Sequence, residues 1–319
     1  MTLIKSLQLL LGELHIFIKK DFHALSYLYT FAFISICIFL NYNFGFYQNV
    51  IRESYFSGNS LWVIPLFYIS IYFATIIPVL IFQKDYKTLR NFRFYSKALF
   101  FIVLYGLAIG YYNYSNWEFP SLFSEEKQYV LRLISQLKGC LFFIPSLLMM
   151  KYFFDKKVLG LYGLAQNTKH IRAYILLFIL MLPFLVFTSF TSDFMRAYPQ
   201  FRPWLYPDVF SWPNWFSTFV FELTYSLDFV MTELIFRGAL VIGMVSILGR
   251  KSVLPMVAMY AAIHFGKPLG ETISSVFGGY ILGALAYQTR HIWGGVIVHI
   301  CLAITMEVMG FLHFYVFKS

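Results

Sequence analysis

The 319-residue chain carries little charge. Only 13% of its residues are Asp, Glu, Lys or Arg, and 59% are hydrophobic; a soluble globular domain carries about 25% charged residues. The apolar residues extend over nearly the whole length, so no soluble domain of ordinary size fits between them. The scarcity of charge therefore excludes a soluble enzyme and predicts an all-α, polytopic membrane protein surrounded by the lipid bilayer.

Cysteine is scarce as well. Cys37, Cys140 and Cys301 each stand within an apolar run, and no two of them have CxxC spacing. This pattern excludes a disulfide framework and a cysteine metal cluster, and it favours a packing role. No small-residue cleavage site follows the leucine-rich stretch Met1–Lys20, so we expect no cleavable signal peptide. The net charge of +10 comes from short loops between apolar runs, which argues against a nucleic-acid partner.

The apolar runs predict the membrane spans. About 20 apolar residues are needed to cross the hydrocarbon core, and we expect nine spans, with eight as the alternative. Before them, the helical spacing of Leu3, Leu7, Leu10 and Leu14 predicts an interfacial amphipathic helix. The predicted spans are Ala24–Phe46, Leu61–Gln83, Ala98–Tyr114, Tyr129–Phe154, Ile171–Phe190, Trp215–Leu248, Val253–Phe265, Glu271–Gln288 and Ile292–Phe317.

Lysine and arginine concentrate in alternate loops, which places the N-terminus in the cytoplasm. The segment Met195–Asn214 contains Pro199, Pro203, Pro207 and Pro213 together with tryptophans, as expected of an outer interfacial loop. This loop divides the chain into N-terminal transmembrane helices with the interfacial helix (residues 1–194) and a C-terminal core (residues 195–319).

Four ionisable residues interrupt the apolar stretch Glu222–Gly238. Each costs about 2.5–3.5 kcal/mol at membrane depth on insertion scales, so the cluster indicates a functional site. Glu233 and Arg237 are four residues apart and share a helix face, on which they can pair. The alternative is a buried ion pair that only locks two helices together. Glu222 lies about 16 Å before Glu233 along the helix, which favours a place at the outer mouth; Asp228 shares another side of the helix with Thr232.

Two histidines in apolar surroundings, His264 and His299, are candidates to lie beside Glu233. Gly266 and Pro268 predict that a helix ends at His264, which would expose its imidazole to a cavity, and His299 stands inside the last span. Each histidine alone is more often a packing residue. One Glu with two His can hold a metal or take a proton from water, and both options suit hydrolysis.

The order of these motifs resembles that of the CPBP family, which includes the CAAX prenyl endopeptidases and bacteriocin-processing, Abi-type membrane proteins. That family carries Glu-Glu-x-x-x-Arg, Phe-x-x-x-His and His-x-x-x-Asn on separate membrane helices. The matching stretches here are T-E-L-I-F-R-G with Glu233 and Arg237, Y-A-A-I-H with His264, and H-I-C-L-A with His299. The resemblance covers roughly Phe221–Glu307, and it implies a bacterial-type inner or plasma membrane.

The resemblance implies an intramembrane endopeptidase that acts on a membrane-embedded or lipidated protein. Glu233 or Asp228 would activate a water together with His264, His299 would stabilise the oxyanion, and Arg237 would orient Glu233. The family's metalloprotease label implies zinc or another divalent metal on Glu233, His264 and His299. A metal-free mechanism is equally consistent with these residues. Nothing in the sequence selects prenylated CAAX substrates.

Two departures from the family pattern favour other functions. The first Glu, which the family uses to activate water, is Thr232 here, and the Asn that helps hold the oxyanion is Ala303. Losing one oxyanion donor costs about 10²–10³-fold in rate. The alternative is therefore a catalytically degenerate member that serves as a membrane binding or immunity protein. A proton-coupled transporter ranks lower, because no inverted repeat or pair of broken helices is visible.

Overall fold

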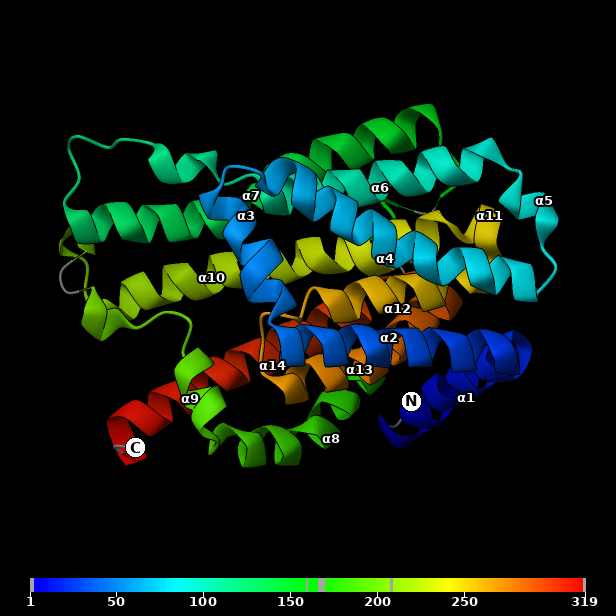
Figure 1. Ribbon diagram of the computed structural model, residues 1–319. Helices are drawn as coiled ribbons and strands as arrows, with labels where there is room; N and C mark the ends of the chain where they lie inside the picture. Colours follow the sequence, from blue (N-terminus) through cyan, green and yellow to red (C-terminus); the bar gives the residue numbers. More distant parts are fainter. Residues whose placement is uncertain (1–2, 159, 166–169, 207–208, 318–319) are drawn as a thin grey trace.

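The computed structural model describes residues 3–158, 160–165, 170–206 and 209–317, whose regular structure is helical. Across these ranges the only β-type pairing is an isolated bridge between Leu161 and Leu164, so the predicted all-α class is confirmed (Figure 1). The helices are α1 Leu3–Asp21, α2 Ala24–Phe44, η1 Tyr47–Arg52, α3 Glu53–Phe56, α4 Ser60–Phe82, α5 Tyr86–Leu89, α6 Phe92–Gly110, η2 Asn113–Asn116, α7 Ser124–Phe153, α8 Ile171–Ser189, α9 Ser192–Ala197, η3 Pro203–Leu205, η4 Val209–Ser211, α10 Asn214–Glu233, η5 Leu234–Gly243, α11 Val245–Leu248, η6 Gly249–Ser252, α12 Val253–Ala262, α13 Leu269–Thr289, α14 Trp293–Leu312 and η7 His313–Phe317.

Eight helical segments among the described residues are long and apolar enough to cross a membrane, which is the lower of the two predicted counts. One of them, Asn214–Ala262, contains both the predicted sixth and seventh spans. The predicted seventh is not an independent span, because α12 has ten residues, or about 15 Å of helix against a hydrocarbon core of about 30 Å. The chain turns at Gly249, and Figure 1 shows α12 running alongside η5 and α13.

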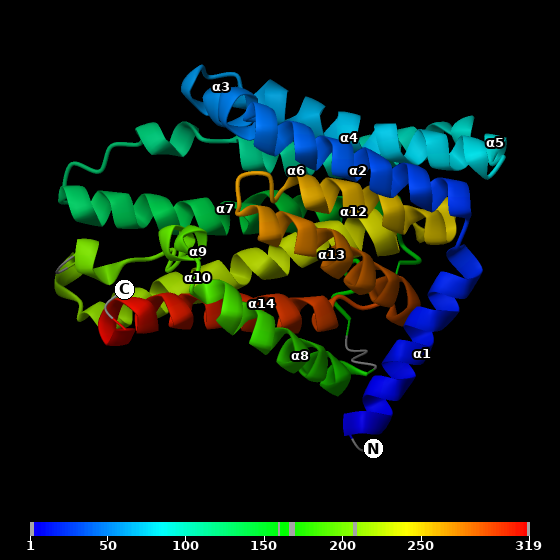
Figure 2. The same ribbon diagram turned by 60° about the horizontal axis from the view of Figure 1, so that its bottom comes forward.

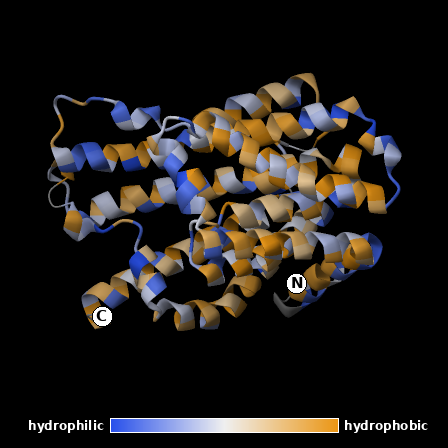
Figure 3. Ribbon diagram, in the orientation of Figure 1, coloured by the Kyte–Doolittle hydropathy of each residue, from blue (hydrophilic) through white to orange (hydrophobic). Residues whose placement is uncertain are grey.

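The long helices lie side by side, with hydrophobic residues along their lengths and hydrophilic ones in the connections at both ends of the bundle (Figure 3). The centre is formed by η5 and α12, all of whose residues are buried. They pack against α4, α6 and α13. Since a helix that is buried on every side belongs to the interior of a protein, this pair is the core around which the other helices assemble.

The predicted amphipathic helix forms as α1, which is not among the eight candidate spans. Its Leu10 and Phe17 are buried against α8 and α13, and two lysines occupy its last turn. Figure 2 shows α1 inclined to the other helices across one end of the bundle. An apolar face on the bundle and a basic end are consistent with a helix lying at the membrane surface.

Two predicted boundaries were placed too late in the chain. The third span begins at Phe92 instead of Ala98, because Lys97 lies inside α6 and is neutralised there by Asp155, with Nζ to Oδ2 at 2.6 Å. The fourth begins at Ser124 instead of Tyr129, because Glu126 caps the N-terminus of α7 by accepting from the Phe123 N–H. In both helices a charged residue finds a partner in the folded protein. Each helix is therefore longer than its apolar run alone predicts.

The predicted outer loop Met195–Asn214 contains the end of α9 and the short turns η3 and η4, while Pro207 lies outside the described residues. The loop packs on the end of α14. The Gln200 N–H donates to the Glu307 carboxylate at 2.9 Å, and the Trp204 ring stacks on Phe314 with centroids 3.6 Å apart. These contacts tie the loop to the C-terminal core.

Candidate active site

The site begins where α10 changes its winding. Glu233 is the last residue of α10, and the chain then continues as the wider π-helix η5, which contains Arg237. Arg237 Nη1 lies 2.8 Å from Glu233 Oε1, and both residues are 0% exposed. The predicted pairing of these two residues is therefore present. Winding changes of this kind are frequent at functional sites in helices.

His299 of α14 joins the ion pair, with its Nδ1 2.6 Å from Glu233 Oε1. Gly295, one turn earlier on α14, makes this approach possible, because a Cβ at that position would overlap the Glu233 carboxylate. The lack of a side chain lets α14 lie directly against the acid, as expected of a small residue at a helix contact.

Tyr260 of α12 lies between the two histidines. Its hydroxyl is 2.7 Å from His299 Nε2, and the Arg237 guanidinium carbon is 4.1 Å from the centroid of its ring. The side chains of Arg237, Glu233, His299 and Tyr260 therefore form one continuous chain of polar contacts. The sequence pointed to Tyr260 only as a tyrosine at the family's phenylalanine position.

His264 lies in the turn after α12, where the sequence predicted a helix end. Its Nδ1 is 2.8 Å from the carbonyl oxygen of Tyr260, and its ring centroid is 4.9 Å from that of Tyr260. Because a carbonyl only accepts, Nδ1 carries the proton and Nε2 keeps its lone pair. His264 is only half-buried, so Nε2 is a proton acceptor on a fixed ring beside the rest of the site.

Helix α2 holds the turn that carries His264. Asn41 Nδ2 donates to the Phe265 carbonyl at 2.9 Å, and the Tyr42 hydroxyl donates to the Lys267 carbonyl at 2.6 Å. Thr272 of α13 donates to the His264 carbonyl at 2.6 Å. No local pattern indicated these residues, because Asn41 and Tyr42 precede the turn by more than 200 residues.

The other predicted site residues lie elsewhere. Asp228 interacts with Lys138 of α7, on a side of α10 that faces away from Glu233. Glu222 lies near Glu307, whose carboxylate accepts from the Gln200 N–H of the outer loop. Thr232 is half-buried beside the acid, and Ala303 is 1% exposed one turn after His299 on α14.

Glu233, His264 and His299 do not fit a metal. Glu233 Oε1 is in contact with Arg237 and His299, both nitrogens of His299 are engaged, and His264 has only Nε2 left. Throughout the described part of the chain, no group of three or more His, Cys, Asp or Glu residues could hold a metal ion. The ionisable side chains contact one another and Tyr260 instead.

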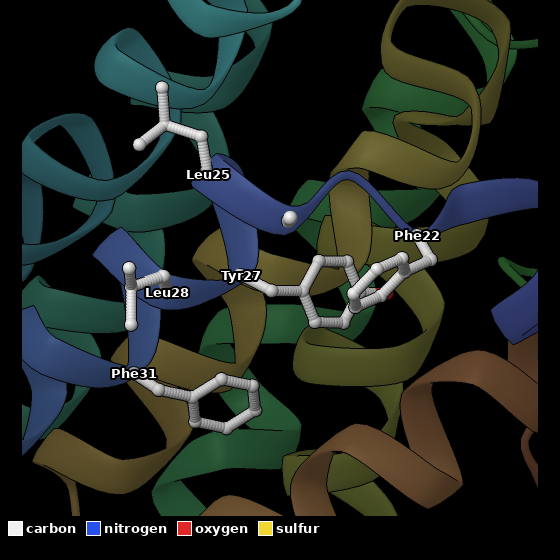
Figure 4. Close-up of a pocket in the computed structure, with 6 residues that line it drawn as sticks. Phe22, Leu25, Tyr27, Leu28 and Phe31 are labelled. Atoms are coloured by element: carbon white, nitrogen blue, oxygen red, sulfur yellow. The ribbon is translucent and has the colours of Figure 1, made fainter.

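A separate apolar groove of about 670 Å³ lies where α1 meets α2, outside this site. Its lining is Phe22, Ala24, Leu25, Tyr27, Leu28 and Phe31 (Figure 4). Apart from the Tyr27 hydroxyl its lining is apolar, and none of the site residues described above lines it.

Comparison with known proteins confirms the family resemblance for the part of the chain that forms the site. Residues 213–305 match the family model described as type II CAAX prenyl endopeptidase Rce1-like. The match begins just before α10 and ends within α14, so it contains Glu233, Arg237, Tyr260, His264 and His299. Comparisons with curated proteins and with solved structures returned no match. Residues 213–305 are therefore similar to the type II CAAX prenyl endopeptidases, within a chain whose long apolar helices are those of an integral membrane protein.

Proposed function

We propose that this protein is an intramembrane endopeptidase that hydrolyses a peptide bond in a membrane-embedded or lipidated protein, without a metal. The observation that carries this proposal is that Glu233 contacts His299, and that His299 and His264 both contact Tyr260. These side chains come from helices distant in sequence. Within the membrane such a cluster of ionisable groups needs a function, because each is costly to insert.

His264 is the base in this proposal. Its Nε2 takes a proton from a water as the water oxygen attacks the peptide carbonyl, and the same nitrogen then returns the proton to the leaving amine. The C–N bond breaks, and the products are a carboxylic acid and an amine. Glu233 does not meet the water, because its carboxylate is fully buried. It orients His299 through Nδ1, while Arg237 holds the carboxylate in place. Of the residues expected from the sequence to activate water, this proposal keeps His264 and leaves out Glu233 and Asp228.

A second candidate is a non-catalytic member that binds a membrane peptide. Thr232 and Ala303 favour it, and so does the complete burial of Glu233, since no carboxylate then remains to assist His264 at the water. In this function the cluster would hold the helices together, and the half-buried His264 would contact the bound peptide.

Replacing His264 tests the proposal. With purified protein in detergent and a quenched library of membrane peptides, including prenylated ones, His264→Gln is expected to lower cleavage about 10²–10⁴-fold, because the general base is lost. His15→Gln is the matched control, since His15 is exposed on α1 away from the site. Cleavage by the unaltered protein is expected to survive chelation.

The opposite result is equally clear. If the unaltered protein cleaves nothing while Thr232→Glu combined with Ala303→Asn does, the binding function replaces the endopeptidase. If His264→Gln cleaves as well as the control, another group is the base.

A further inference from the structure

Tyr260 is the one polar side chain of the cluster to which the family resemblance assigns no role. Its ring is buried, with 5% exposure, and its hydroxyl meets His299 Nε2 at 2.7 Å. Behind it, His299 Nδ1 lies 2.6 Å from Glu233 Oε1, and Glu233 is paired with Arg237. The result is a hydroxyl, an imidazole and a carboxylate in sequence, the order in which proteins tune the acidity of a hydroxyl group.

The carboxylate determines what the hydroxyl can do. A negative Glu233 favours a proton on His299 Nδ1. In the first possible state His299 is neutral, and its Nε2 accepts a hydrogen bond from the Tyr260 hydroxyl. In the second state His299 is an imidazolium, and its Nε2 donates to the Tyr260 oxygen. In the second state the Tyr260 oxygen accepts a charge-assisted hydrogen bond and its own proton is free to be donated. A buried hydroxyl polarised in this way is a strong donor to an anion, and it requires no reorganisation when the anion forms.

The ring that carries the hydroxyl also lies beside the base. Tyr260 and His264 are joined by the contact from His264 Nδ1 to the Tyr260 carbonyl oxygen, and their rings are 4.9 Å apart. His299, whose Nε2 the hydroxyl covers, retains 14% exposure of its side chain. A peptide carbonyl attacked by a water at His264 would therefore have its oxygen close to Tyr260.

We propose that Tyr260 is a catalytic residue whose hydroxyl donates a hydrogen bond to the oxyanion of the tetrahedral intermediate. This inference rests on the proposed endopeptidase function and deepens it. As the C–O bond to water forms, the carbonyl electron pair moves to the oxygen, and the water proton moves to His264 Nε2. The Tyr260 hydrogen bond holds the negative oxygen until the carbonyl re-forms and the amine leaves with the proton from His264. Tyr260 keeps its own proton throughout, and His299 with Glu233 orients it.

Tyr260→Phe removes only the hydroxyl and leaves the ring that packs against Arg237. Its kcat is expected to fall about 10²–10³-fold, the usual effect of losing one oxyanion donor, with KM changed less than about twofold. Tyr72→Phe is the matched control, because Tyr72 is 0% exposed and its hydroxyl has no hydrogen-bond partner. Thermal unfolding of both variants in detergent separates catalysis from stability.

A binding measurement tests the same contact without turnover. A phosphinic peptide, whose tetrahedral phosphorus carries a negative oxygen, is expected to bind Tyr260→Phe at least about tenfold more weakly than the unaltered protein, which is about 1.4 kcal/mol. An N-methylated peptide of the same sequence, with a planar carbonyl, should bind both equally. Equal losses for the two peptides would reduce Tyr260 to a structural residue.

The outcomes for the inference and for the proposed function are distinct. If the unaltered protein cleaves and Tyr260→Phe cleaves equally well or faster, the inference is wrong and the endopeptidase stands. If the protein cleaves nothing but binds the phosphinic peptide through Tyr260, the anion contact stands and catalysis does not. If it neither cleaves nor binds the phosphinic peptide, both proposals are rejected.

Discussion

At the scale of single residues, the site depends on an acid that is enclosed completely. Glu233 has no exposed surface, and its neutralisation is shared by Arg237 and His299. A buried charge without such partners would cost several kcal/mol. The arrangement needs α14 to come within contact distance of the carboxylate, and only a glycine at position 295 leaves that space.

Gly295→Ala is therefore expected to be destabilising. Its methyl group would overlap the Glu233 carboxylate, and forcing extra volume into a packed core costs about 1–3 kcal/mol. Gly278→Ala on the neighbouring helix α13 is the control, because a Cβ there meets nothing within 4 Å. Unfolding in detergent micelles measures both variants, and equal stability of the two would contradict the close packing described here.

At the scale of elements, helix α2 positions a turn of the core. Asn41 is 4% exposed and is used twice, as donor to the Phe265 carbonyl and as acceptor from the Tyr47 N–H, each at 2.9 Å. A turn of this kind inside a membrane has few other partners for its carbonyls, so the helix that supplies them holds His264 in place.

Asn41→Ala should lower the free energy of unfolding by about 1–3 kcal/mol, since two buried backbone groups lose their partner. It should also lower cleavage, because the His264 ring is no longer held. Asn43→Ala, two positions along the same helix, removes an exposed amide that bonds only to Phe39 in its own helix. If that variant loses as much stability as Asn41→Ala, the effect belongs to α2 itself and not to the turn.

At the scale of the whole molecule, one buried cluster joins the first half of the chain to the core. Lys97 of α6 donates to Asp155, at 2.7 Å to Oδ1, and to the Gly243 carbonyl at the end of η5, at 2.6 Å. Tyr162 donates to the other oxygen of Asp155 at 2.8 Å. Because Lys97 and Asp155 are 2% and 5% exposed, this cluster fixes η5, and with it Arg237, against α6.

Asp155→Asn leaves Lys97 buried with an uncompensated charge, and breaking a buried pair in this way costs about 3–5 kcal/mol. Lys97→Met combined with Asp155→Asn should cost less, because both charges leave together. Asp85→Asn is the control. Asp85 pairs with Lys251, and their side chains are 21% and 24% exposed. Breaking such a partly exposed pair is expected to lower the free energy of unfolding by only about 0–1 kcal/mol. Should Asp155→Asn match this control in chemical unfolding, the cluster does not join the two halves.

Local sequence rules determined much of the fold and part of the site. Low charge and long apolar runs predicted an all-α membrane protein, because only helices and closed barrels satisfy a backbone in lipid. The spacing of Glu233 and Arg237 predicted their pairing, since residues four apart share a helix face. Gly266 and Pro268 predicted the helix end at His264. Each of these follows from interactions within a few residues of the chain.

Tertiary packing decided the rest. Asp228 lies on the side of α10 near Lys138 of α7, while Glu233 contacts His299. This difference depends on which helix lies on each side of α10, and no periodicity contains that information. The same holds for Lys97 inside α6, for Asn41 at the His264 turn and for the hydroxyl of Tyr260 on His299. Polar side chains in a membrane must find partners wherever the neighbouring helices provide them, so the sequence shows which groups need a partner and only the packed helices show which partner each one has.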